Sequence, residues 1–309
     1  MRPATPQAAA IMEADGTAGL KKPFWQKLLG SDNPNPGKFE DIGSDSRKIF
    51  MLDSFEGMRF EYQRGLSNSF GVSHILHLQP AQDNYGTYDF SANFSQGKHL
   101  LLSRTQTNGD VLARYILTAT PNLTVQFQSQ LTKAPHQSNA ILTADYKGGD
   151  WFGQLKVGSF AQWGLSYLQS VTKNLAVGVD LTYLGRPPFN QMPMCISTVA
   201  ARYSTERMVA LAQLTSNARI QAAYVQRVKD NLTFGTEFTF DLGSRESTCA
   251  AGYEYSTPQG SFKTNLSSDG KVTSTFEKQL SEVSAVVLSA EVDHGKKACK
   301  YGIGLQLLQ

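Results

Sequence analysis

Carboxylate side chains recur in short segments that are otherwise rich in aromatic and aliphatic residues. Asp180, for example, lies between Val179 and Leu181. The carboxylates that we single out are Asp89, Asp145, Asp180, Glu237 and Glu254. An ionised carboxylate accepts hydrogen bonds and attracts cations, and several along one path attract a basic partner through weak, screened contacts. Two roles fit these residues: they attract a cationic partner, or they hydrate a polar surface and pair with bases on it.

Signatures of catalysis and of metal binding do not occur in the sequence. There is no G-x-S-x-G elbow, no P-loop and no dinucleotide fingerprint, because Gly302-Ile-Gly304 lacks the third glycine. His74 and His77 are three apart, so on a strand they point to opposite faces and cannot share a metal ion. The cysteines lie far apart: Cys195, Cys249 and Cys299. We therefore expect no enzyme, no metal site and no cofactor.

The composition of the chain excludes several protein classes. Charged residues make up 18% of the 309 residues, hydrophobic residues make up 40%, and the mean hydropathy is −0.30. The sequence has no run of ~20 apolar residues, so it predicts no membrane-spanning helix. The formal net charge is only +3, and no basic run is interleaved with aromatics, so we expect no nucleic acid partner. No apolar core of a secretory signal follows Arg2, which favours an organellar protein made in the cytosol over a bacterial outer-membrane protein.

Strict alternation of apolar and polar residues dominates from Asp53 to the end of the chain. In residues 122–131, leucine, valine and phenylalanine share one face, while asparagine, threonine and glutamine occupy the other. Residues 174–181 and 231–240 alternate in a similar way. Such a pattern predicts strands with one apolar and one polar face.

Turn residues punctuate these segments at regular intervals, for example Asn108-Gly109 and Asp269-Gly270. About nineteen segments fit into residues 53–309, each long enough for a membrane strand of ~9–11 residues and a short turn. We therefore predict one meander of antiparallel hairpins in an all-β domain.

The number of strands separates a membrane barrel from a soluble β protein. Alternation alone also fits a half-buried soluble sheet. A closed sheet of about nineteen strands, however, encloses a lumen too wide for side chains to fill, so its polar face must line water. Most strand charges fall on that polar face: Glu61, Asp89, Asp145, Asp180, Glu237, Glu254, Glu277, Glu291, Arg59, Arg114, Lys156, Arg202, Arg219 and Lys263. We therefore predict a transmembrane β-barrel.

The part of the chain before the strands lacks their alternation of apolar and polar residues. Residues 1–43 contain Pro, Gly and Asn without sustained periodicity, and we expect a flexible N-terminal segment. Ser44 is a suitable N-cap, and Ile49 and Leu52 follow with helical spacing. We therefore predict a short helix over residues 44–52 and the barrel over residues 53–309.

Several segments resemble one family of membrane barrels. They are Pro36-Gly-Lys-Phe-Glu40, Phe55-Glu-Gly-Met-Arg-Phe60, Tyr88-Asp-Phe-Ser-Ala-Asn-Phe94, Thr107-Asn-Gly-Asp-Val-Leu-Ala-Arg114 and Leu288-Ser-Ala-Glu-Val-Asp-His294. Through them, about residues 34–309 look like the channel-forming subunit of the translocase of the outer mitochondrial membrane. The similarity is closest to the plant and green-algal branch.

The last strand carries the most specific match. Lys300-Tyr-Gly-Ile-Gly-Leu-Gln-Leu307 resembles the signal that directs mitochondrial barrels to their insertion machinery. The four defined positions of that signal are occupied by Lys300, Gly302, Leu305 and Leu307. The same residues also fit an ordinary last strand with alternating apolar side chains.

The resemblance implies a barrel of nineteen strands whose first and last strands pair in parallel, with the helix inside the pore. It also implies a location in the outer mitochondrial membrane, in contact with its lipids. The expected partners are a central receptor subunit, small single-helix subunits and a second copy of the barrel.

The substrate implied by the resemblance is an unfolded precursor protein, which would pass through the pore without covalent chemistry. Basic presequences would meet the carboxylates singled out above, and Gln126, Gln128, Gln221 and Asn265 would let varied segments slide. A metabolite pore of the voltage-dependent anion channel type is the alternative. Its lumen should be net basic, and a measurement of ion selectivity separates the two.

Overall fold

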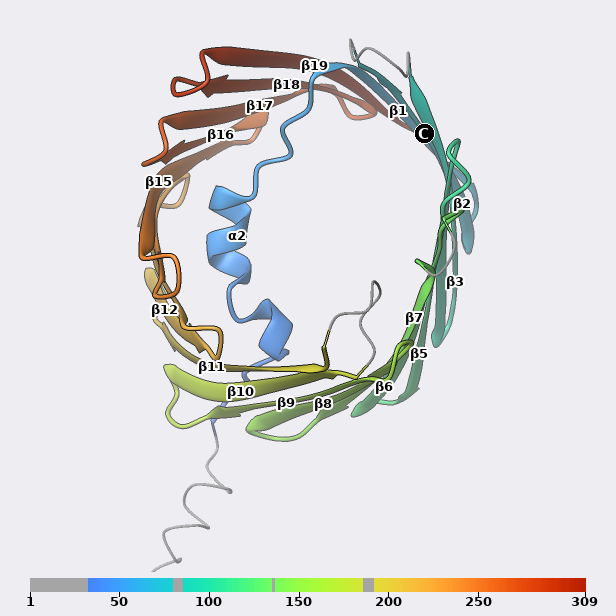
Figure 1. Ribbon diagram of the computed structural model, residues 1–309. Helices are drawn as coiled ribbons and strands as arrows, with labels where there is room; N and C mark the ends of the chain where they lie inside the picture. Colours follow the sequence, from blue (N-terminus) through green and yellow to red (C-terminus); the bar gives the residue numbers. More distant parts are fainter. Residues whose placement is uncertain (1–32, 80–85, 135–136, 186–191) are drawn as a thin grey trace, which may run out of the picture. The chain divides into compact units, whose positions relative to one another are not determined.

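A closed sheet forms nearly all of the part of the chain that the computed structural model describes, which is residues 33–79, 86–134, 137–185 and 192–309. Nineteen strands each pair with their neighbours in the sequence, and β1 also pairs with β19 (Figure 1). The β1–β19 pair is parallel, and the other pairs among the described strands are antiparallel. This confirms the nineteen-strand barrel and the parallel closing pair expected above.

The strands are joined mostly by short turns. Their bounds are β1 Gly57–Ser67, β2 Phe70–Leu78, β3 Thr87–Gln96, β4 His99–Gln106, β5 Val111–Thr120, β6 Leu123–Leu131, β7 Asn139–Lys147, β8 Trp151–Gly158, β9 Gln162–Ser170, β10 Leu175–Leu184, β11 Met194–Ser204, β12 Met208–Thr215, β13 Arg219–Lys229, β14 Leu232–Asp241, β15 Glu246–Thr257, β16 Gly260–Ser267, β17 Lys271–Ser281, β18 Ser284–Asp293 and β19 Ala298–Leu308.

Side chains alternate between the lumen and the outside along the strands. Thr124 of β6 pairs with Asp145 of β7, and Asp145 contacts a segment inside the barrel, so both residues face the lumen. Phe127 of β6 and Leu155 of β8 fall on the other face and are 42% and 48% exposed. Such large apolar side chains are normally buried in a soluble protein. Here they form an outer belt suited to lipid.

Among the described residues, no helix is long and apolar enough to cross a membrane.

Residues 33–56 cross the lumen from one rim to the other. Asn35 Nδ2 donates to the carbonyl oxygens of Gly148 and Trp151, both at 2.9 Å, at the rim where β8 begins. β1 begins at Gly57, and β1 runs in the same direction as β9 because eight antiparallel steps separate them. The start of β1 therefore lies at the opposite rim from the start of β8. Figure 1 shows the connecting segment inside the ring of strands.

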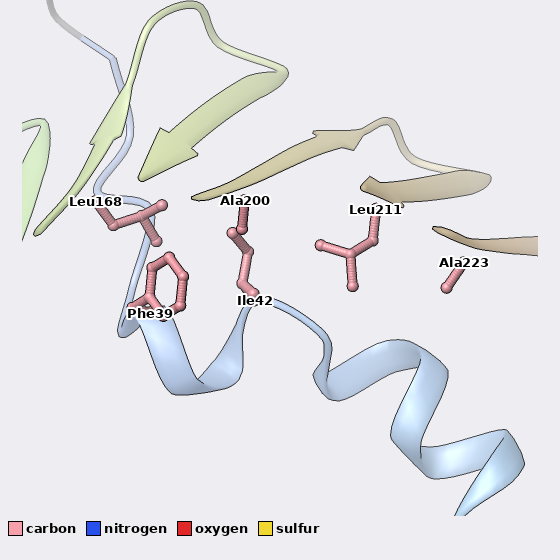
Figure 2. Packing of buried hydrophobic residues seen from close by; sticks show 6 residues of the cluster. All are labelled: Phe39, Ile42, Leu168, Ala200, Leu211 and Ala223. Carbon is pink, nitrogen blue, oxygen red and sulfur yellow. The ribbon is translucent and has the colours of Figure 1, made fainter. Parts of the chain in front are cut away.

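A small apolar cluster fixes the first half of this segment to the wall (Figure 2). Phe39 belongs to the 3-10 helix η1 (Phe39–Asp41), and Ile42 follows it. These two side chains pack with residues of β9, β11, β12 and β13: Leu168, Ala200, Leu211 and Ala223. The small alanines let the segment approach the sheet closely. The segment therefore lies along one side of the lumen.

The helix α2 (Ser44–Phe50) has seven residues and packs on the same side. Ile49 is only 1% exposed. A Cβ atom on Gly235 or Gly252 would lie 3.0 Å or 2.9 Å from the Ile49 side chain. Glycine at these two positions of β14 and β15 therefore leaves room for Ile49. A helix this short is marginal alone, so packing must supply much of its stability.

The ends of the helix differ from those expected. α2 ends at Phe50, whereas residues 44–52 were expected to be helical. Gly43 occupies the N-cap position and makes no side-chain cap, so Ser44 is the first helical residue. A flexible segment was expected over residues 1–43, and residues 1–32 of it lie outside the described residues.

Candidate functional site

The five carboxylates singled out from the sequence all fall on the inner face of the wall. Asp89 and Asp145 are 2% and 3% exposed, because neighbouring side chains cover them. The others lie on β10, β14 and β15: Asp180, Glu237 and Glu254. The five carboxylates differ in whether a basic side chain already neutralises them. This difference decides how strongly each one attracts a cation.

Three of these carboxylates are ion-paired. Asp89 pairs with Arg104 of β4. Asp145 Oδ2 lies 2.7 Å from Lys38 Nζ and also accepts from Gln154. Glu254 Oε1 lies 3.1 Å from Lys263 Nζ on the neighbouring strand β16. Each of these carboxylates therefore adds little net negative charge to the lumen.

The other two have no basic partner within 4.0 Å among the described residues. Asp180 accepts hydrogen bonds from Ser166 and from Thr182, and Glu237 accepts one from Gln221. Hydroxyl and amide donors stabilise a carboxylate without cancelling its charge. Both carboxylates line one cavity of about 650 Å³ between α2 and the wall. This cavity also carries Lys156 and Arg219, so its wall presents both signs of charge.

Charged residues of the lumen segment explain part of this pattern. Glu40 Oε1 lies 2.6 Å from Lys156 Nζ, and Asp45 Oδ2 lies 2.6 Å from Arg202 Nη2. Acids of the segment thus neutralise two bases of the wall. Lys156 lines the same cavity as Asp180 and Glu237, and its pair with Glu40 leaves it less able to neutralise them. Sequence reasoning missed these pairs, because no local signal links residues more than one hundred positions apart.

β6 lies next to the strand that Lys38 contacts, and it lines the lumen with neutral polar groups. Gln126 accepts a hydrogen bond of 3.0 Å from Arg114 Nη2. The inner face of β6 carries further amide and hydroxyl groups, on Thr124, Gln128 and Gln130. These groups offer many weak hydrogen bonds and no strong binding site. Gln221 and Asn265, which were expected to behave likewise, lie under α2 and contact Glu237 and the Phe50 carbonyl oxygen.

The four positions of the C-terminal signal are divided between the two faces of β19. Lys300 pairs with Glu291, and Gly302 pairs with Ser289, both on the inner face. Leu305 and Leu307 fall on the outer face. A Cβ atom on Gly302 would collide with the carbonyl oxygen of Phe55 and lie 2.7 Å from its ring. The fold itself therefore requires glycine at this position.

The histidines and cysteines considered in the sequence analysis lie apart in the structure. In the described ranges, no group of three or more His, Cys, Asp and Glu side chains is placed to hold a metal ion. His74 Nδ1 is 2.6 Å from the Tyr88 hydroxyl on the outer face, whereas His77 pairs with Arg59 on the inner face. The three cysteines are exposed and unlinked.

A family model described as eukaryotic porin matches residues 35–304. The match covers most of the barrel and most of the lumen segment.

Curated relatives share one kind of name. The chain is 32% identical to "Probable mitochondrial import receptor subunit TOM40-2" of Arabidopsis thaliana, over 91% of this chain and 93% of that one. It is 28% identical to "Mitochondrial import receptor subunit TOM40 homolog 2" of Drosophila melanogaster, over 88% and 84%. It is 27% identical to the human TOM40 homolog, over 89% and 78%.

Among solved structures, an engineered variant of the Rh. blastica porin superposes with a TM-score of 0.50. The alignment covers 78% of this chain and 98% of the porin, at 10% identity. This likeness concerns the fold alone.

Proposed function

The chain belongs to the eukaryotic porin family, and from this premise we propose that it is a protein-conducting channel of the outer mitochondrial membrane. Its substrates are unfolded precursor proteins, which pass through the lumen without covalent change. The observation that carries this proposal is the 32% identity to a mitochondrial import receptor subunit over nearly the whole chain. The closed barrel with polar groups inside and apolar groups outside supports it.

The lumen supports passage rather than capture. A pore conducts well when its contacts are favourable enough for entry and weak enough for release. One pair of opposite charges 4 Å apart contributes about 1 kcal/mol in water. Asp180 and Glu237 would therefore attract a basic presequence without stalling it, and the amide groups on β6 would contact uncharged stretches. We propose these two carboxylates as the strongest part of the acidic path, and Asp89, Asp145 and Glu254 as weaker parts.

The experiment that tests the function is single-channel recording of the purified protein in a planar bilayer, with and without a basic presequence peptide. We expect the peptide to interrupt the current at low concentration, and an acidic peptide of equal length to do so much less. A strongly anion-selective pore that ignores the basic peptide would instead support the metabolite-pore alternative.

The remaining assignments are also proposals. We propose that Lys300, Gly302, Leu305 and Leu307 direct the barrel to its insertion machinery. We propose that a central receptor subunit, small single-helix subunits and a second barrel lie against the apolar outer face, together with lipid. The size of the complex extracted in a mild detergent tests this assembly. We further propose that residues 33–43 belong to the lumen segment, because they contact the wall.

A further inference from the structure

The inner face of the parallel closing pair has few side chains at the end where β1 begins. Gly57 of β1 pairs with Gly302 of β19, and Arg59 of β1 pairs with Gly304 of β19. Three of these four lumen-facing positions are therefore glycine. Glycine in a strand interior weakens the strand and often marks the close approach of another backbone. Parallel pairing is also slightly less stable per residue than antiparallel pairing.

Phe55, just before β1, occupies the space that the glycines leave. Its ring would lie 3.1 Å from a Cβ atom on Gly304 and 2.7 Å from one on Gly302. Its backbone N–H donates to Ser289 Oγ on β18 at 3.2 Å. The guanidinium carbon of Arg59 lies 5.6 Å from the ring centroid, which is within range of a cation–π contact.

The two residues before Phe55 make contacts on either side of the closing pair. Ser54 Oγ donates to Glu291 Oε2 on β18 at 3.0 Å. Asp53 forms an ion pair with Arg59 on β1. Residues 53–55 thus contact β18, β19 and β1, which are the last two strands and the first.

We propose that Asp53, Ser54 and Phe55 form a brace that holds the closing pair together from inside the lumen. The ring supplies apolar contacts that the glycines cannot supply, and the hydrogen bonds to β18 keep the ring over the seam. The closing pair then depends on the lumen segment as well as on its own backbone hydrogen bonds. Gly304 is not one of the four positions of the C-terminal signal, and the brace accounts for the absence of a side chain there.

Hydrogen exchange of the refolded full-length barrel tests the brace. Phe55→Ala is compared with Phe39→Ala, which removes another ring of the same segment at β9. We expect Phe55→Ala to speed exchange of the β1 and β19 amides roughly tenfold and to leave those of β8 and β9 unchanged. We expect Phe39→Ala to leave the seam amides unchanged. Equal exchange at the seam in the two variants, or a uniform rise over all strands, would overturn the proposal.

A second experiment tests whether the Phe55 ring fills the space over Gly304. If Phe55→Ala does not refold, Phe55→Leu replaces it in both experiments. Gly304→Val places a side chain where the ring lies, so we expect a lower midpoint of thermal unfolding. Adding Phe55→Ala vacates that space, so the double variant should unfold at a higher temperature than Gly304→Val alone. Adding Phe39→Ala to Gly304→Val should lower the midpoint further. If the effects of Phe55→Ala and Gly304→Val simply add, the ring does not occupy the space over Gly304 and the brace is refuted.

Discussion

Lys38 Nζ lies 2.7 Å from Asp145 Oδ2, so the beginning of the lumen segment is tied to β7 by an ion pair whose acid is almost completely covered. The two residues are 107 positions apart in the sequence. Asp145, one of the carboxylates expected to guide a substrate, therefore also anchors the segment.

Replacement of Lys38 by Met should destabilise the folded barrel. The change leaves the Asp145 carboxylate covered without its cation, which costs about 1–3 kcal/mol since Lys38 itself is partly exposed. Urea unfolding of the barrel in vesicles measures the loss. Lys48→Met is the control, because its contact with Asp45 is at 4.0 Å and exposed; it should change stability by less than about 0.5 kcal/mol. Equal losses in the two variants would contradict the anchor.

Neutralising Asp180 and Glu237 together should weaken block by a basic presequence peptide. Each contact contributes about 1 kcal/mol before screening, so the double variant Asp180→Asn, Glu237→Gln should need roughly threefold to tenfold more peptide. The effect should shrink as salt rises. The control is Glu254→Gln combined with Lys263→Met, which removes a pair of opposite charges and leaves the net charge of the lumen unchanged. A control effect as large as that of the double variant would exclude a special role for the unpaired carboxylates.

Replacement of Ile49 by Ala should release α2 from the wall. Ile49 is 1% exposed, and loss of such a side chain costs about 2–4 kcal/mol. We expect faster hydrogen exchange within residues 44–50 and faster proteolysis of the segment. Met51→Ala removes a side chain of similar size that is 74% exposed, and it should leave both rates near those of the unmodified protein.

A charge on the outer face should prevent insertion, whereas a charge on the inner face should not. Phe127→Arg places a guanidinium in the apolar belt at a cost of about 2–4 kcal/mol if the site lies near the midplane. Gln128→Arg, one residue later, faces the lumen. The yield of folded barrel in lipid vesicles should fall for Phe127→Arg only. A similar yield for both variants would argue against lipid at this face.

The wall could be predicted from the sequence because its rule is local. Each strand repeats with a period of two, so the face of Phe127 or Asp180 follows from its immediate neighbours. The parallel closing pair was a different kind of prediction, since it came from the resemblance of segments such as Pro36-Gly-Lys-Phe-Glu40 to known channels. The structure confirms both.

The charge state of the lumen could not be predicted, because it depends on partners distant in the sequence. Asp45 and Arg202 are 157 positions apart, and no local sequence pattern around either residue indicates that they pair. The end of α2 was also uncertain, since a seven-residue helix takes its length from packing rather than from intrinsic propensity. The contacts of Phe55 could not be predicted either, because they are made with β19, which is distant in the sequence.

The path of the lumen segment also determines sidedness. Gln309 bonds through its backbone to Gln63 and Gly65, near the end of β1, which is the rim where β8 begins and where Asn35 is held. Asn35 and Gln309 therefore lie on the same side of the membrane. In a chain whose Cys195, Cys249 and Cys299 are replaced by Ser, a cysteine placed at Asn35 should be reached by an impermeant thiol reagent from one compartment only. A protease-sensitive tag fused after Gln309 should be cleaved from that same compartment and not from the other.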